Sequence, residues 1–220
     1  MPAIDPELQA LKENLLDMLS MVKEQMEKCV VAIEKQDIDV ARQVVDDEKK
    51  INIQELAIDR DCENILALHT PVATDLRLVL ATLKITNDLE RIADSAKSLA
   101  KVLCKDISKK EFNWIESFGI VPMLEIIADM LKEMGNALKK NETRPALKAS
   151  KKDEELNDYF KKALKTTAAL IVKNPDDAKT ILTLMLMVRN LERSGDLTKN
   201  IAEELVFHME ARVLKHQRKK

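Results

Sequence analysis

Two short segments with the same pattern of acidic residues could together hold a cation. The segment Leu-Glu-Arg-Ile-Ala-Asp returns as Leu-Glu-Arg-Ser-Gly-Asp 102 residues further along the chain. In each copy a glutamate precedes an aspartate by four residues, Glu90 before Asp94 and Glu192 before Asp196. Side chains four apart lie on the same face of a helix, where two like charges repel each other. The repetition therefore favours a role in which the carboxylates bind something positive.

Further acidic side chains interrupt the apolar stripes of two other expected helices. Glu48 and Glu55 occupy positions of a heptad stripe that otherwise carries core side chains, and Asp153 takes the place of Glu48 in a similar stripe 105 residues later. One helical turn further on, Asn52 and Asn157 also correspond. Each of these helices therefore presents a carboxylate and an amide, one turn apart, beside its core face.

The acidic residues form two candidate metal sites. A buried carboxylate must be paired or neutral, and several converging oxygens suit a hard or borderline cation. Helical bundles build metal sites from inward-pointing carboxylates. The predicted ligands are Glu48, Asn52, Glu90 and Asp94 for the first site, and Asp153, Asn157, Glu192, Asp196, Asn200 and Glu203 for the second. Where the second site has Asn200 and Glu203, the first has Ser98 and Lys101, so the positive charge of Lys101 predicts weaker binding there.

An ion-pair network is the alternative interpretation of the same residues. Arg91, Arg193, Lys84 and Arg189 could neutralise the acids, or the acidic strips could face solvent. No Ser-His-Asp order, phosphate-binding glycine loop or Cys-His pair stands out, and the three histidines show no ligand spacing. The sequence therefore leaves a metal site and an ion-pair network open.

The composition is typical of an all-α protein. Of 220 residues, 45% are hydrophobic, and only 3 are glycine and 6 are proline, which leaves few turns. The formal net charge of −2 does not support a nucleic-acid-binding protein, which usually has a basic face. No run reaches the roughly 18 apolar residues of a membrane-spanning helix, and no secretory signal is visible. We therefore expect a cytoplasmic protein.

Apolar periodicity and helix-breaking residues predict six long helices. Pro71 and Pro175 mark two of the breaks, because the residue before proline is pushed out of the helical region, whereas the fourth helix is expected to continue through Pro122. The expected helices lie at about 5–35, 38–68, 72–104, 111–141, 145–173 and 176–215.

The order of helices and breaks is the same in both halves of the chain. The predicted fold is therefore all-α, with two tandem three-helix bundles related by internal duplication. The predicted domains are a first bundle at 1–104, a linker at 105–110 and a second bundle at 111–220.

Around the paired acidic segments the chain resembles the PhoU family of phosphate-transport regulators. The run from Pro71 to Arg77 and the run from Asp88 to Asp94 are similar to the signature of the family's first repeat. The run from Arg189 to Asp196 is similar to the signature of the second, and the resemblance covers nearly the whole chain. It implies that the acidic pairs hold multinuclear metal clusters, with iron or zinc as the metal. Carried over by position, the pairs are Glu48 with Asn52, Glu90 with Asp94, Asp153 with Asn157, and Glu192 with Asp196.

The resemblance also implies a function. Such proteins contact the ATPase subunit of a phosphate ABC transporter and a sensor histidine kinase, damp phosphate uptake, and repress the starvation response when phosphate is plentiful. We therefore expect a metal-associated regulator that is no enzyme, that forms a homodimer and that meets the membrane only through its partners. The alternatives are a carboxylate-bridged metal enzyme and a metal-free helical scaffold. The enzyme is disfavoured because the Glu-x-x-His pairs of ferritin-like sites do not occur.

Overall fold

The first half of the chain folds into three long helices, as the sequence predicts. The computed structural model describes residues 4–105 and 107–214, and helices α1 (Asp5–Glu34), α2 (Ile38–His69) and α3 (Ala73–Leu103) make up most of the first segment. The Asp37 carboxylate starts α2 by accepting hydrogen bonds from two backbone amides of its first turn. Thr70 ends the helix in a left-handed conformation, with φ of 50°, directly before Pro71.

The second half is more divided than the sequence predicts. Its α-helices are α4 (Lys109–Ser117), α5 (Ile120–Lys140), α6 (Thr143–Ala149), α7 (Asp153–Lys173) and α8 (Ala178–Glu210), with short 3₁₀ turns at Ser150–Lys152 and Pro175–Asp177. Secondary structure in the described residues is thus entirely helical, and the predicted all-α class is confirmed.

The prediction of one continuous helix over 111–141 is wrong. The chain breaks at Gly119, whose φ of 68° is left-handed, and α5 begins immediately afterwards. In an uninterrupted helix Pro122 would lack the amide that bonds to the Phe118 carbonyl, and its ring would clash with that carbonyl. After the break Pro122 lies in the first turn of α5, where no intrahelical donor is needed.

The helix expected over 145–173 is also interrupted. A 3₁₀ turn at Ser150–Lys152 separates α6 from α7. The Ser150 hydroxyl donates a hydrogen bond to the Leu147 carbonyl, at 3.1 Å, and such side-chain bonds compete with regular helix geometry. Because of these two interruptions, the described part of the second half contains the five helices α4 to α8 in place of the three long helices predicted there.

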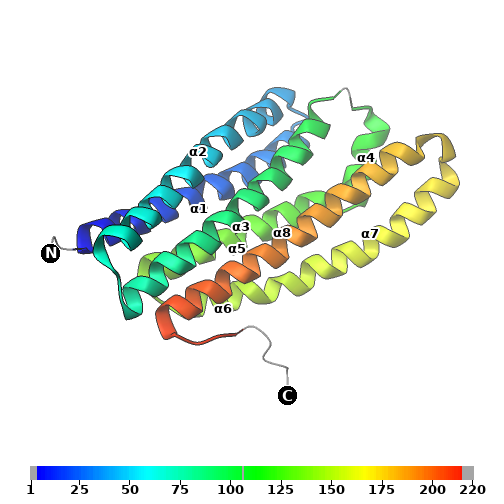
Figure 1. Cartoon of the computed structure of the whole chain (residues 1–220). Helices are drawn as coiled ribbons and strands as arrows, with labels where there is room; N and C mark the ends of the chain where they lie inside the picture. The colour runs from blue at the N-terminus through cyan, green and yellow to red at the C-terminus, as the bar shows by residue number, and fades with distance from the viewer. Residues whose placement is uncertain (1–3, 106, 215–220) are drawn as a thin grey trace, which may run out of the picture.

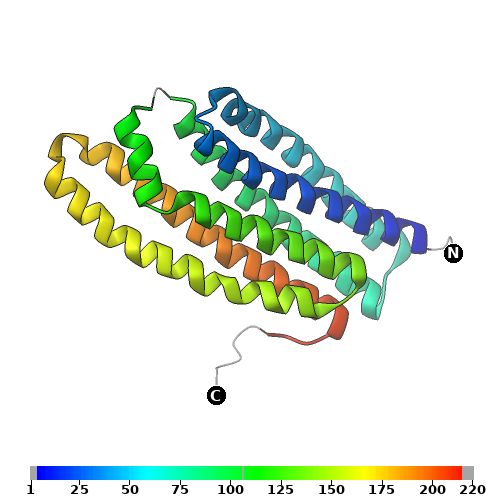
Figure 2. The ribbon, with the colours of Figure 1, turned by 180° about the vertical axis from the view of Figure 1, so that it is seen from behind.

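The long helices form two layers. Figure 1 shows α2, α3, α8 and α7 side by side in that order, and each neighbouring pair in this row is in contact. Seen from behind in Figure 2, α1 and α5 pack against each other and form the second layer. The first layer thus consists of helices from both halves of the chain.

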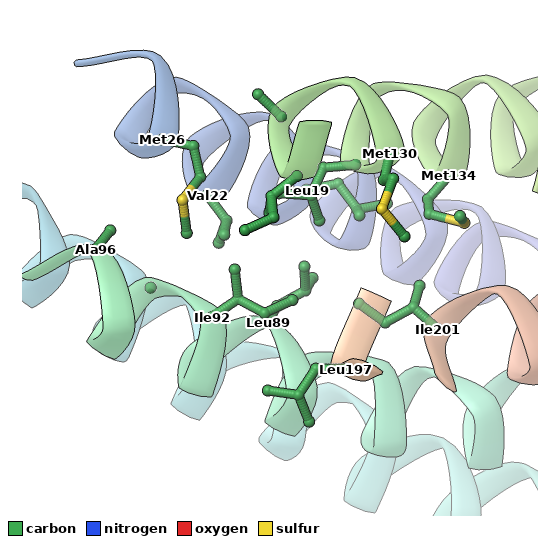
Figure 3. Close-up of a cluster of buried hydrophobic side chains, with 14 of the residues drawn as sticks. Leu19, Val22, Met26, Leu89, Ile92, Ala96, Met130, Met134, Leu197 and Ile201 are labelled. Atoms are coloured by element: carbon green, nitrogen blue, oxygen red, sulfur yellow. The ribbon is translucent and has the colours of Figure 1, made fainter. Parts of the chain in front are cut away.

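One hydrophobic core lies between the layers. Figure 3 shows Leu19 and Met26 of α1, Ile92 of α3, Met130 of α5 and Ile201 of α8 meeting in it. Helices of the two halves therefore share their buried surface, mainly where α1 packs on α5 and α3 packs on α8.

The duplication and the predicted domains at 1–104 and 111–220 stay predictions, because the shared core does not separate two bundles. Residue 106 of the predicted linker at 105–110, and the outer ends of both predicted domains, lie outside the described residues. Among the described helices, none combines the length and the apolar character needed to cross a membrane.

The break at Gly119 provides a test of the fold. A Cβ added there would lie 2.7 Å from the Tyr159 ring on a left-handed backbone, so Gly119→Ala should lower the free energy of unfolding by at least about 1 kcal/mol. Gly135→Ala is the matched control, because Gly135 lies within α5 and its added Cβ would have no neighbour within 4 Å. This control should raise the free energy by about 0.5–1 kcal/mol. Urea unfolding measures both, and equal effects would contradict the assigned break.

Candidate functional site

The first predicted site lies between α2 and α3, and a lysine occupies it. Glu48 of α2 is only 3% exposed, and one of its oxygens accepts a hydrogen bond from the Asn52 amide at 2.7 Å. The other oxygen pairs with Lys97 Nζ of α3 at 2.8 Å. Lys97 Nζ also lies 3.8 Å from Asp94 Oδ1. Lys97 therefore bridges acids from the two helices.

The charges at this site act in opposite directions on its two glutamates. Burial raises the pKa of Glu48, but the hydrogen bonds from Lys97 and Asn52 outweigh it, and the net shift is downward. The pKa of Glu90 is raised, first by burial and then by the charges of Asp94 and Glu48. Glu48 is thus a well-compensated carboxylate, whereas the charges of Arg91 and Lys97 offset only part of the repulsion at Glu90.

Glu55 belongs to the same electrostatic cluster, although the predicted ligand set does not include it. Its pKa is raised by burial and then by the charges of Glu90, Asp59 and Asp94. The sequence did contain the signal, because Glu55 occupies a core position of the same heptad stripe as Glu48.

The second predicted site lies between α7 and α8 and has a similar arrangement. Asp153 of α7 is 3% exposed, and its Oδ2 is 3.4 Å from Lys199 Nζ of α8. Its Oδ1 is buried and has no hydrogen-bond partner among the described residues. Asn157 donates its amide hydrogen to the backbone carbonyl of Asp153, at 3.2 Å, instead of to the carboxylate. Asp153 is therefore less well compensated than Glu48.

The pKa shifts at the second site agree with this geometry. The pKa of Asp153 is raised by burial and by the Asp196 charge, and Lys199 offsets only part of this. The pKa of Glu192 is raised by burial and by the charges of Asp196 and Asp153. The charge of Asp196 thus raises the pKa of both Asp153 and Glu192, and the nearby cations Lys199 and Arg189 offset only part of this effect.

The close contact of α7 with α8 requires a glycine beside Asp196. A Cβ on Gly195 would collide with the Leu156 side chain of α7 and would lie 3.3 Å from Asp153 Oδ1. Because nothing projects from Gly195, the buried carboxylate of Asp153 can approach the α8 backbone. The glycine therefore helps to position the second site.

Sequence reasoning missed the two lysines that occupy the sites. Lys97 follows Asp94 by three residues and Lys199 follows Asp196 by three, so both extend the repeated motif on the same helix face. The alternative interpretation named other basic residues for this role. The spacing of the motif would have indicated these lysines.

Two predicted ligands of the second site lie further along α8. Asn200 is half-buried one turn after Asp196, and Glu203 lines a pocket of about 150 Å³ with Lys84 and Glu204. In that pocket Lys84 Nζ of α3 pairs with the Glu204 carboxylate at 3.1 Å. Glu203 thus lies beside the Lys84–Glu204 ion pair, at the far end of the predicted ligand set.

Comparison with known proteins places this geometry in a family. The family model described as "PhoU domain" matches residues 15–103 and 120–205, which include both acidic clusters. The chain belongs to the PhoU family. The family resemblance of the repeated motifs is thereby confirmed.

Individual members of the PhoU family match over almost the whole chain. The phosphate-specific transport system accessory protein PhoU of Edwardsiella tarda is 27% identical, over 96% of this chain and 86% of the relative. The homologue of Pseudomonas aeruginosa is 30% identical, with the same coverage. These relatives carry the names of accessory proteins, in agreement with the prediction that the chain is no enzyme.

Solved structures of PhoU proteins share the fold. The crystal structure of PhoU from Pseudomonas aeruginosa superposes with a TM-score of 0.86 at 28% identity, covering 96% of this chain and all of that one. That of the phosphate transport system regulatory protein PhoU from Streptococcus pneumoniae gives 0.80 at 24% identity, covering 97% of this chain and all of that one, and supports the fold alone.

The donor atoms of both clusters suit a cation. Asn52 Oδ1 and Asp153 Oδ1 are buried oxygens without a hydrogen-bond partner among the described residues, one in each cluster. Such oxygens are suitable ligands for a hard or borderline cation. In the described part of the chain, however, no three His, Cys, Asp or Glu side chains converge as a ready metal site. Lys97 and Lys199 supply the positive charge instead.

The unequal compensation of the two buried acids predicts opposite effects of neutralising them. Glu48→Gln breaks a buried ion pair and should lower the free energy of unfolding by about 1–3 kcal/mol at pH 7. Asp153→Asn removes a charge whose pKa is raised, so it should increase this free energy. Urea unfolding of chelator-treated protein measures both.

The pH dependence of the same variants is the control. An acid with a raised pKa keeps its proton longer in the folded chain, so Asp153 destabilises the fold as pH rises above the ordinary carboxyl range of about 4. The free energy of unfolding of Asp153→Asn should therefore increase relative to that of the wild type as pH rises. Glu48, whose pKa is lowered, stabilises the fold above that range and loses this effect as pH falls through its folded pKa. Parallel curves for the two variants would contradict the assigned electrostatics.

Proposed function

We propose that this chain is a regulatory accessory protein of a phosphate-specific transport system. The observation that carries the proposal is the PhoU family match in both halves of the chain, together with relatives that carry this name over almost its full length. The protein acts in the cytoplasm, lowers phosphate uptake and keeps the phosphate-starvation response repressed while phosphate is plentiful. Its partners are the ATPase subunit of the transporter and a sensor histidine kinase, and it works as a homodimer.

The surface of the helical layer supports a role in protein contacts. Ile53 and Leu56 of α2 are 69% and 66% exposed, and Leu182 and Leu186 of α8 are 50% and 54% exposed. Apolar side chains presented one turn apart on a helix are typical of surfaces that bind other proteins. These exposed apolar pairs on α2 and α8 therefore support an adaptor that acts by binding other proteins.

Loss of the protein in its own host tests the regulatory role. In phosphate-rich medium a deletion strain should take up more phosphate and express starvation-response genes, because the repressing contact is missing. Radioactive phosphate uptake and a transcriptional reporter measure the two effects. Complementation with the wild-type gene is the control. A deletion strain that matches the wild type in both readouts would refute the proposed function.

We further propose that the acidic clusters bind metal ions, with iron or zinc as the preferred metals. The donors are Glu48, Asn52, Glu90 and Asp94 between α2 and α3, and Asp153, Asn157, Glu192 and Asp196 between α7 and α8, with Asn200 and Glu203 at the far end of the second cluster. The pKa values of Glu90 and Glu192 are raised by burial and by neighbouring carboxylates, and a bound cation would stabilise the ionised form of both. Lys97 and Lys199 must then give up their places, so each lysine competes with the metal.

Elemental analysis of purified protein incubated with Fe(II) or Zn(II) and desalted tests the metal sites. Wild-type protein should retain metal, and the pairs Glu90→Ala/Asp94→Ala and Glu192→Ala/Asp196→Ala should each lose part of it. Helicity by circular dichroism should be unchanged, because the apolar stripes do not depend on these acids. Lys199→Met should retain more metal, since it removes the competing charge.

The matched control is Asp59→Ala/Glu63→Ala, an acidic pair with the same spacing on α2 outside both predicted sets. It should retain metal like the wild type. Equal metal content in all variants would show that the predicted acids are not the ligands. Absence of metal in the wild type would favour a metal-free adaptor whose acidic clusters are neutralised by ion pairs.

A further inference from the structure

A polar pocket lies between the two acidic clusters, where α3 meets α8. It has a volume of about 250 Å³, and its polar lining consists of Arg91, Asp94, Ser95 and Ser98 from α3 and Asn190 and Arg193 from α8. Because α3 and α8 are the central helices of the four-helix layer in Figure 1, the pocket lies at the middle of that layer. Its lining combines two arginines with hydroxyl and amide groups.

The two arginines are available to bind a ligand. Within the described residues neither guanidinium forms an ion pair with a carboxylate within 4 Å. Arg91 acts on Glu90 only as a nearby charge that lowers its pKa. The two residues stand 102 positions apart, in the two copies of the repeated motif, so each half of the chain contributes one. Two guanidinium groups lining one pocket are suited to a small oxyanion, which they can bind through paired N–H donors.

Neutral donors complete the lining. Ser98 supplies a hydroxyl and Asn190 an amide, and both side chains are half-buried. Ser95 already donates its hydroxyl hydrogen to the Arg91 carbonyl, at 3.1 Å, so it remains an acceptor. Charged and neutral donors together are the arrangement that binds a compact anion with several oxygens.

We propose that this pocket binds inorganic phosphate. A volume of about 250 Å³ is below the roughly 300–1,000 Å³ range of pockets for drug-sized ligands, so the pocket suits a small ion better than a nucleotide. The pocket itself argues for a small oxyanion, whereas the choice of phosphate rests on the proposed function, which this inference deepens by giving the regulator a ligand of its own.

Asp94 provides selectivity among oxyanions. A carboxylate in an anion pocket repels a fully ionised ligand such as sulfate, but it accepts a hydrogen bond from an oxyanion that still carries a proton. Phosphate carries such a proton at neutral pH. The presence of Asp94 in the lining therefore predicts that phosphate binds more tightly than sulfate.

Calorimetric titration of sodium phosphate into the full chain at pH 7, with EDTA present, tests the proposal. EDTA removes any bound metal that could itself hold phosphate. Ionic strength is kept constant so that changes in charge screening do not contribute to the signal. The wild type should bind one phosphate per chain, and sulfate should bind more weakly. Arg91→Gln/Arg193→Gln should weaken phosphate binding by about tenfold or more, because charge-assisted hydrogen bonds are lost. Asp94→Asn should reduce the preference for phosphate over sulfate.

Arg60→Gln is the matched control, since Arg60 is exposed on α2 and does not line the pocket. It should bind phosphate like the wild type, and circular dichroism should show that all variants are folded. Phosphate binding that survives in the double arginine variant overturns the proposal. So does a titration of the wild type without saturable heat, if adding the protein also leaves the width of the phosphate ³¹P NMR signal unchanged. Equal binding of sulfate and phosphate overturns the role of Asp94. Because purified protein is used without transporter, kinase or metal, these outcomes are independent of those that test the proposed function.

Discussion

The packing of α3 against α8 is the interaction on which the rest of the structure depends. Both helices bury small side chains, such as Ala93 on α3 and Ser194 and Thr198 on α8, and small side chains allow helices to approach closely. Because α2 packs on the far side of α3 and α7 on the far side of α8, this one contact joins both acidic clusters in a single layer (Figure 1). Large side chains in the same core, contributed by α1 and α5, then close the layer from behind (Figure 2). The layer therefore holds two acidic clusters of similar composition, one on each side of the α3–α8 contact.

The two acidic clusters differ in how well the protein alone compensates them. Glu48 has an amide and a lysine on its two oxygens, and its pKa is lowered. Asp153 has a longer contact with Lys199, an oxygen without a partner among the described residues, and a raised pKa. A buried charge that is poorly compensated raises the free energy of the folded state, and any cation that binds there recovers that energy. The second cluster therefore has more to gain from a cation than the first.

The parts of the fold that the sequence could predict are those set by local patterning. Apolar periodicity and the break at Pro71 placed the first three helices within a few residues, because each helix must bury one stripe and a proline lacks the donor that a helix interior needs. The break at Gly119 was missed because a glycine alone gives a weak signal and Pro122 can lie inside a helix only at its start. The shared core and the partners of Glu48 and Asp153 could not be predicted either. Periodicity shows which face of a helix is buried. It does not show which helix covers that face, or which lysine of a neighbouring helix pairs with a buried acid.

Asp94 connects the acidic cluster and the arginine pocket. Its carboxylate lies 3.8 Å from Lys97 Nζ, it raises the pKa of Glu90, and it also lines the pocket of Arg91 and Arg193. A ligand that engages Asp94 in the pocket changes the charge that Glu90 and Lys97 experience, and a cation beside Glu90 changes the charge that the pocket offers. Such coupling between two binding equilibria is reciprocal, so a cation that strengthens anion binding must itself be bound more tightly when the anion is present. If the proposed metal and oxyanion both bind, the shared aspartate would couple the two occupancies through charge alone, without any rearrangement of the helices.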